Sequence, residues 1–332
     1  PQEANEMKRF NDILCVVESG KTSAAALERA VTLAENNQAS LTVVSVAEQV
    51  IAGIGMPPGG PISSQLQAAL VKTHAGKLET LVEPYRSRTG IETRVLTGVP
   101  FLEIIREVLR NNRDLVIKVP ETRDWLDRFM GSDDMHLLRK CPCPVWMVKP
   151  QVPQAYRRIL AAVDVDTAYP ADELETRHQL NLQVLEMARS QALSDFSELH
   201  IVCAWHAVGE SAMHGAFINT PEKEIIAYVE EVRRTHEDNL DKLTGETIGN
   251  LGAEALAYLK PRKHLLKGWA RKEVPLLARE IKADLVVMGT VGRTGVPGFL
   301  MGNTAETILN QIDCSVLAVK PPGFETPVTL QD

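Results

Sequence analysis

The chain repeats itself once, and this internal similarity limits its possible folds more than any other feature. Three pairs of segments match in the same order: 13–18 with 159–164, 114–118 with 284–288, and 143–150 with 314–321. The partners in these pairs are 146, 170 and 171 residues apart, so the order is kept while one region has lengthened. Two homologous halves explain this pattern better than chance.

In each half, a helical pattern leads directly into an apolar run. Apolar residues at i, i+3, i+4 and i+7 occur at Phe101, Ile104, Ile105 and Val108, and again at Val274, Leu277, Ala278 and Ile281. Apolar strands alternating with amphipathic helices indicate a parallel sheet covered on both faces. We therefore predict an α/β fold of two tandem doubly wound, Rossmann-like domains, each with a five-stranded parallel sheet. The prolines of 150–153 place the boundary between domains 1–150 and 151–332. Two stretches, 51–64 and 209–222, are irregular, and each follows the second predicted strand of its half. We expect the first, which is rich in Gly and Pro, to be a surface loop or a lid over a pocket.

Composition excludes several classes of protein. The 332 residues are 44% hydrophobic and 24% charged, as in ordinary globular proteins. With 36 basic and 43 acidic residues the net charge is −7, so we expect no direct nucleic-acid binding. No apolar run is long enough to span a membrane. The beginning of the chain lacks signal-peptide features, and the five scattered cysteines are typical of buried thiols, so we expect a cytoplasmic protein.

A glycine-rich loop is the sharpest local feature. It contains Gly289, Gly292 and Gly302, leaves the fourth predicted strand of the second half, and opens the helix that begins near Asn303. Glycines let backbone amides approach a phosphate closely, and a helix N-terminus adds amides without intrahelical partners. Asn303 and Thr304 could cap that helix or bind a phosphate oxygen.

Two charged residues extend this candidate anion site. Arg293 could add a charge-assisted contact to phosphate or pair with a neighbouring carboxylate. Asp164 ends the first strand of the same half, so it should face the same crevice beyond the carboxyl ends of the strands. There it suits ribose hydroxyls or a metal ion beside phosphates. The alternative for Asp164 is an Asx turn that starts a loop.

The loop pattern resembles that of the universal stress protein family. Glycine, two residues, glycine, nine residues, glycine and a small polar residue occur at Gly289, Gly292, Gly302 and Asn303, although many members have serine at the last position. Segment 316–321 resembles the family's last strand, which commonly pairs across its dimer interface. The two tandem copies resemble the two-domain, E-type members, as do segments 135–142, 145–149 and 289–295.

The resemblance implies a pocket for an adenine nucleotide, ATP or ADP with or without Mg²⁺. Its residues here would be Asp164, Ala204, Gly289, Gly292, Gly302, Asn303 and Thr304, with Ala204 contacting adenine. It also implies a stress-response role that is regulatory or protective rather than enzymatic, and a pseudo-dimer of the two domains. A homodimer stays open.

The first half departs from this pattern. Val119 and Thr122 replace the first two glycines, and Glu18 replaces Asp164. The intervening loop carries three acids that would repel phosphate: Glu121, Asp124 and Asp127. Only the Gly131–Ser132 pair is kept. We expect this half to have lost triphosphate binding and to serve as a scaffold or to hold something else.

No catalytic or metal-binding residues are predicted. Cys141-Pro-Cys143 lacks the spacing of redox C-x-x-C motifs and favours buried thiols. Any ATP hydrolysis is expected to be slow, because no general base is evident. Three alternatives stay open: a carrier of an apolar or lipid-like ligand under the Gly/Pro-rich stretch 51–64, an enzyme of the wider adenine-nucleotide α/β superfamily, and a pure interaction protein.

Overall fold

The computed structural model describes residues 10–18, 23–50, 60–120, 132–150, 155–214, 220–249, 251–290 and 301–330. The chain divides into two compact units. The first unit contains residues 1–154 together with 295–301 and 314–332, and the second contains 155–294 and 302–313. Each unit is described by itself below.

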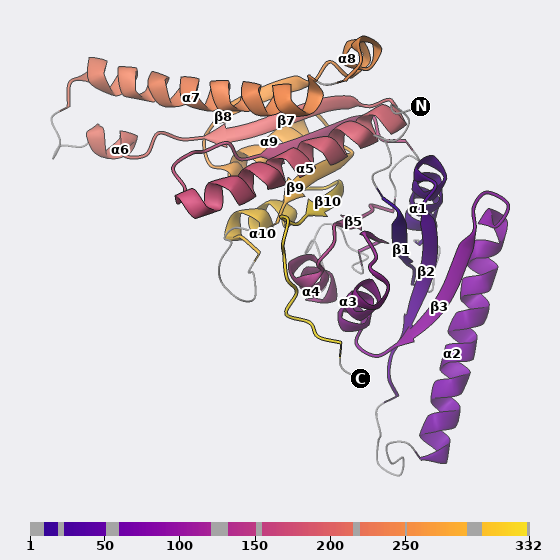
Figure 1. Cartoon of the computed structure of the whole chain (residues 1–332). Helices are drawn as coiled ribbons and strands as arrows, with labels where there is room; N and C mark the ends of the chain where they lie inside the picture. Colours follow the sequence, from indigo (N-terminus) through magenta and orange to yellow (C-terminus); the bar gives the residue numbers. More distant parts are fainter. Residues whose placement is uncertain are drawn as a thin grey trace. The chain divides into compact units, whose positions relative to one another are not determined.

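The sheet of the first unit has the strand order β3-β2-β1-β4-β5 in its parallel part (Figure 1). Its strands are β1 (Asp12–Val16), β2 (Ser40–Ala47), β3 (Ile91–Thr97), β4 (Leu115–Lys118) and β5 (Val145–Met147). Its helices are α1 (Ala24–Asn37), α2 (Pro61–Val82), the 3-10 turn η3 (Glu83–Tyr85), α3 (Pro100–Asn111) and α4 (Ser132–Lys140). Helices α1 and α2 cover one face of this sheet and α3 and α4 the other. The predicted doubly wound topology is confirmed.

The last strand of the second repeat completes the sheet of the first unit. Strand β10 (Ser315–Val319) runs antiparallel to β5, with Leu317 level with Trp146. The amide of Lys149 also donates to the hydroxyl of Ser315 over 3.0 Å. The sheet is therefore mostly parallel, with one antiparallel pairing that the expected all-parallel domains did not include.

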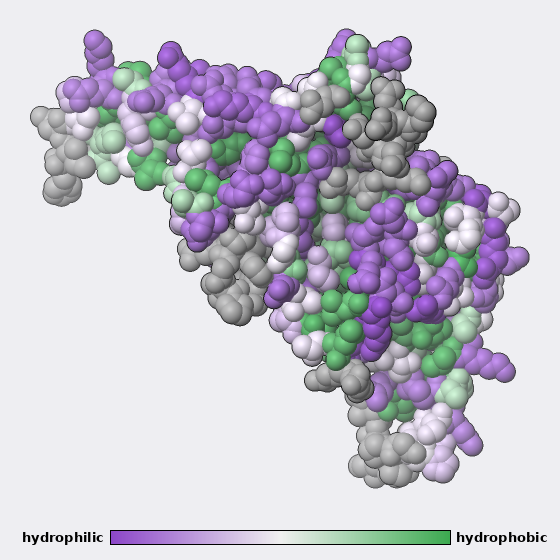
Figure 2. Space-filling model, in the orientation of Figure 1, coloured by the Kyte–Doolittle hydropathy of each residue, from purple (hydrophilic) through white to green (hydrophobic). Residues whose placement is uncertain are grey.

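The second unit has the parallel strand order β9-β6-β7-β8. Its strands are β6 (Arg158–Val163), β7 (Glu198–Trp205), β8 (Arg262–Lys267) and β9 (Leu285–Gly289). Its helices are α5 (Ala171–Asp195), α6 (Glu210–Met213), α7 (Glu222–Ile248), α8 (Ala253–Leu259), α9 (Ala270–Glu280) and α10 (Asn303–Leu309). Helix α5 packs on β6, β9 and α7, and α9 packs on β7 and α10. The outward face of α7 is mostly hydrophilic (Figure 2), in keeping with ion pairs such as Arg233 with Glu230.

Local sequence explains where these elements begin and turn. In α3 the apolar stripe that includes Ile104, Ile105 and Val108 is buried, as an amphipathic helix over a sheet requires. Two glycines at equivalent places, Gly98 and Gly268, have φ of 140° and 150°. Few other residues tolerate this conformation. They follow β3 and β8 and set the turns into α3 and α9.

Two segments expected to be irregular are partly helical. Stretch 51–64 was expected to be a loop, but helix α2 begins at Pro61, because proline fits the first turn of a helix. Residues 51–59 lie outside the described residues. Stretch 209–222 includes the short helix α6. Among the described residues, no helix is both long and apolar enough to cross a membrane.

Candidate functional site

The predicted site residues of the second repeat that the structure describes lie at one edge of the second unit. Ala162 of β6 is level with Val202 of β7 and with Met288 of β9. Asp164 directly follows β6, Ala204 lies near the end of β7 and Thr290 directly follows β9, so the three residues lie at the carboxyl ends of three neighbouring strands. Strand order reverses between β6 and β9, where open α/β sheets bind ligands.

The Asp164 carboxylate makes several contacts and stays 46% exposed. Its Oδ1 accepts the amide of Asp166 over 3.2 Å, which forms the Asx turn considered as the alternative role of Asp164. Its Oδ2 accepts the hydroxyl of Tyr169 over 2.7 Å and lies 3.5 Å from a guanidinium nitrogen of Arg177. A carboxylate has about four acceptor positions, so these contacts leave room for a ligand hydroxyl. The turn and a binding role are compatible.

Tyr169 and Arg177 are residues that the sequence analysis missed. The Arg177 guanidinium carbon lies 3.4 Å from the centre of the Tyr169 ring, and Glu173, one helical turn earlier, pairs with Arg177 over 3.2 Å. Burial, together with the negative charge of Asp164, raises the pKa of the Tyr169 hydroxyl. The hydroxyl therefore remains a donor to Asp164 at neutral pH. The i, i+4 spacing of Glu173 and Arg177 was the available signal.

Gly289 has a packing role at the start of the loop. A Cβ at this position would lie 2.6 Å from Cδ2 of Leu180 in α5. Such a contact requires Leu180 to move. A Gly289→Val substitution would therefore displace the Leu180 side chain of α5, so a loss of binding in this variant would not by itself show a phosphate contact. The phosphate-binding role of Gly289 stays a prediction.

The two described ends of the glycine loop meet. The amide of Gly302 donates to the carbonyl of Thr290 over 3.1 Å, so this amide closes the loop and is already engaged. Gly302 is the N-cap of α10 and brings no side-chain acceptor to the helix. Asn303 and Thr304 are exposed in its first turn. Two predicted residues, Gly292 and Arg293, lie outside the described residues.

The equivalent edge of the first unit is filled by an ion cluster. Lys118, at the end of β4, places its Nζ 2.9 Å from Oδ1 of Asp134 and 2.9 Å from Oε1 of Glu18. The Lys118 and Asp134 side chains are 3% and 0% exposed, while Glu18 is 54% exposed. The second repeat has Met288 and Ala305 at the positions of Lys118 and Asp134. The buried Lys118–Asp134 pair is a physical difference between the two halves at this edge. The acids Glu121, Asp124 and Asp127 lie outside the described residues.

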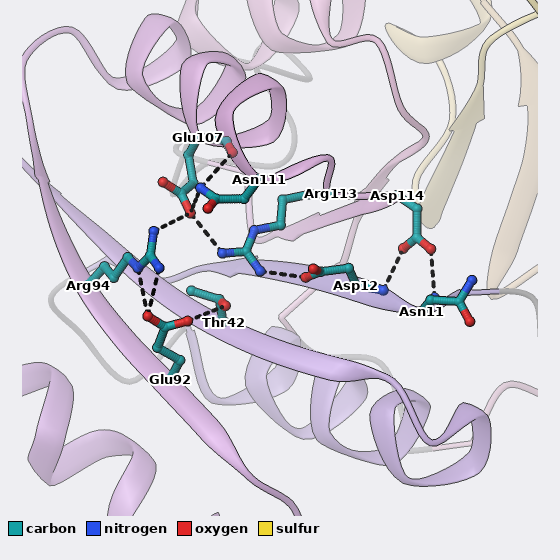
Figure 3. Close-up of polar contacts among 9 residues, drawn as sticks. All are labelled: Asn11, Asp12, Thr42, Glu92, Arg94, Glu107, Asn111, Arg113 and Asp114. Atoms are coloured by element: carbon teal, nitrogen blue, oxygen red, sulfur yellow. Dashed lines mark hydrogen bonds and ion pairs between the residues drawn. The ribbon is translucent and has the colours of Figure 1, made fainter.

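A second polar cluster lies at the amino ends of strands β1–β3, beside a cavity of about 450 Å³ (Figure 3). Arg113 bridges Asp12 and Glu107, and Arg94 bridges Glu107 and Glu92. Three carboxylates thus surround two guanidinium groups. We interpret this ion network as a connection between α3 and the strands, because each of its charged groups already has a partner of opposite charge within the unit.

Other sequence predictions concern residues outside the candidate site. Cys141 and Cys143 are buried, as predicted, and so are Trp146 and Trp205. All five cysteines lie among the described residues, and none of them is in a disulfide. In the part of the chain that the structure describes, no three His, Cys, Asp or Glu side chains come together in a way that could hold a metal ion.

The matches to known proteins cover both repeats. The model of the family described as "Universal stress protein family" matches residues 9–149 and 155–320. Universal stress protein E of Photorhabdus laumondii is 27% identical over 97% of this chain and 98% of its own length. Universal stress protein E of Escherichia coli K12 is 32% identical over 70% of this chain and 69% of its own length.

Solved structures agree with these relatives. A functionally unknown protein from Pseudomonas aeruginosa PAO1 has a TM-score of 0.68 and 25% identity, over 96% of this chain and 95% of its own. A universal stress protein from Archaeoglobus fulgidus has a TM-score of 0.61 at 17% identity, which shows likeness of fold alone. With a family match on each repeat and relatives that span nearly the whole chain, the protein belongs to the universal stress protein family as a tandem two-domain member.

Proposed function

We propose that this universal stress protein binds an adenine nucleotide, ATP or ADP, at the carboxyl edge of its second unit and acts as a regulatory or protective stress protein. The observation that carries the proposal is that Asp164, Ala204 and Thr290 lie at the carboxyl ends of three neighbouring strands, beside the strand-order reversal. In this arrangement Asp164 would accept a ribose hydroxyl and the Ala204 backbone would contact adenine.

The glycine loop and the first turn of α10 would hold the phosphates. Gly302 closes the loop through Thr290, so the amides that can face a phosphate belong to Asn303 and Thr304 rather than to Gly302. Gly289, Gly292 and Arg293 stay in the proposed site as residues of the same loop. Mg²⁺, where bound, would be held through the phosphates and Asp164.

The substitution Asn303→Asp tests nucleotide binding without destabilising the fold. A carboxylate in the first turn of α10 stabilises the helix through its dipole, but repels phosphate. We expect the protein to keep its stability while Mg-ATP affinity, measured by calorimetric titration, falls at least about tenfold. The control Asn303→Ser keeps a small polar group and should bind as the parent does. Equal affinity of the aspartate variant would refute the phosphate site.

A second substitution tests the ribose contact. Asp164→Asn keeps the size of the side chain but removes its charge, and we expect weaker binding. Asp241→Asn is a matched control, because Asp241 is an exposed acid of α7 paired with Lys263. One site per chain in the titration would favour binding by the second unit alone. Absence of binding, with an amphiphile released on denaturation, would favour the alternative of an apolar-ligand carrier.

The remaining parts of the functional hypothesis stay predictions. Catalysis is not proposed. The cytoplasmic location, the pseudo-dimer of the two repeats and a homodimer are expectations from the sequence and the family.

A further inference from the structure

Two cysteines of the first unit lie side by side between a helix and a strand. Cys141 directly follows α4, and Cys143 lies two residues before β5. Their sulfurs are 3.6 Å apart. Both side chains are buried, with exposed fractions of 0% and 7%. Because a disulfide needs about 2.05 Å between sulfurs, a small movement of this short segment would join them.

A buried lysine from the last strand lies beside this pair. Lys320 directly follows β10, and its Nζ donates to the carbonyls of Leu138 and Arg139 in the last turn of α4. It also lies 4.9 Å from the centre of the Phe324 ring. Burial lowers the pKa of Lys320 to about 8, although the charges of Cys141 and Cys143 act in the opposite direction. Because this pKa still lies above neutral pH, Lys320 keeps a positive charge at the end of α4, directly before the two cysteines.

The surroundings make the two thiols unequal. Burial opposes ionisation of Cys141, but the hydrogen bonds involving Cys143 and the charge of Lys320 outweigh it and lower its pKa. The pKa of Cys143 is raised by its hydrogen bond to Cys141, by burial and by nearby charges that include Asp114. Of the two sulfurs, Cys141 therefore loses its proton more readily than Cys143.

We propose that Cys141 and Cys143 are a redox-active dithiol that a hydroperoxide oxidises to an intramolecular disulfide. Cys141 is the sulfur that attacks the peroxide. The Cys141 thiolate attacks one oxygen of hydrogen peroxide, breaks the O–O bond and becomes a sulfenic acid, and the released hydroxide takes a proton to give water. The Cys143 sulfur then attacks the Cys141 sulfur, forms the S–S bond, and a second water leaves. Two thiols and one peroxide give one disulfide and two waters, so two electrons pass from sulfur to oxygen.

This dithiol is a property of the first repeat. The second repeat has Ile312 at the position of Cys141 and Cys314 at the position of Cys143. Cys15 is a suitable reference thiol, because it is fully buried in β1 and desolvation raises its pKa to about 12. Hydrogen peroxide is small and uncharged, so we expect it to reach the buried sulfurs of Cys141 and Cys143. A bulky disulfide reagent would not reach them.

The whole chain is treated with hydrogen peroxide, unfolded, alkylated and digested with trypsin. Trypsin does not cut between Lys149 and Pro150, so the two cysteines lie in the peptide 141–157. We expect this peptide to lose about 2 Da and to resist alkylation until it is reduced. Cys15→Ser should leave the rate of disulfide formation unchanged. If Cys141 and Cys143 both remain fully alkylatable after Cys15 or Cys314 has been oxidised, the proposal is wrong.

Single substitutions test the roles of the two sulfurs. In Cys143→Ser, dimedone should trap a sulfenic acid on Cys141, whereas Cys141→Ser should form one on Cys143 at least about tenfold more slowly. Lys320→Met should slow Cys141 oxidation by about tenfold, the effect of one pKa unit, and Lys320→Arg should restore it. Equal rates on the two sulfurs would overturn the assignment of Cys141. That comparison keeps Lys320, so it stays decisive if Lys320→Met fails to fold.

Discussion

The ion cluster of the first unit allows a double-mutant test of why the two repeats differ. Replacing Lys118 by methionine, its counterpart in the second repeat, leaves the Asp134 carboxylate in a fully buried position without its lysine. Removing one partner of a buried pair costs about 3–5 kcal/mol, whereas replacing both by apolar groups is often neutral. We therefore expect Lys118→Met to be strongly destabilising, and Lys118→Met with Asp134→Ala to recover most of the loss.

The assay is urea unfolding with hydrogen exchange read by mass spectrometry, which follows peptides of β4 and α4 separately from those of β6 and β7. With a slope of about 3 kcal/mol/M, the single substitution should lower the midpoint of the first unit by about 1–2 M. Glu18→Gln is the matched control, because Glu18 is 54% exposed and should contribute less than about 1 kcal/mol. If the double variant is as unstable as Lys118→Met, the reasoning fails.

Three further predictions concern backbone, pH and chain length. Gly245→Ala, inside α7 with no atom near its new Cβ, should stabilise the protein by about 0.5–1 kcal/mol, whereas Gly268→Ala, at φ of 150° and facing Glu273, should cost about 1–3 kcal/mol; thermal unfolding compares them. Burial lowers the pKa values of His200 and His264, so the folded state binds protons less readily than the unfolded one. Stability should be complete above about pH 6.5 and fall below it, and His264→Gln should weaken this dependence in urea midpoints. A chain ending at Asp313 lacks β10, so hydrogen exchange should quicken in β5 more than in β7; equal protection of β5 would contradict this.

Much of the fold could be predicted because its signals are local. The matching apolar runs correspond to β1 with β6 and β4 with β9, and the stripe beginning at Phe101 lies in α3. That Asp164 lies at the same edge as the start of the glycine loop could be predicted from one rule, that ligands bind beyond the carboxyl ends of the strands of an open α/β sheet. The start of α2 was missed because a proline that usually interrupts structure is here in the first turn of a helix.

The site contacts that were missed depend on distances that no sequence pattern contains. Tyr169 reaches back five residues to Asp164 only because of the path of the intervening loop. Lys118 is the last residue of an apolar strand, where a lysine side chain usually points to solvent. It is buried here because it pairs with Asp134, which lies 16 residues away in the chain. The approach of Leu180 to Gly289 depends likewise on how α5 lies on β9.

The pairing of β5 with β10 sets an order for folding during synthesis. Lys149 and Ser315 are 166 residues apart in the chain and nevertheless hydrogen-bonded. When the ribosome has completed the first repeat, β5 is an open sheet edge, and it stays so until nearly the whole second repeat has been translated. Contacts of such long range form slowly, and open edges invite association with other chains. The nascent protein is therefore most dependent on chaperones while its second repeat is still being made.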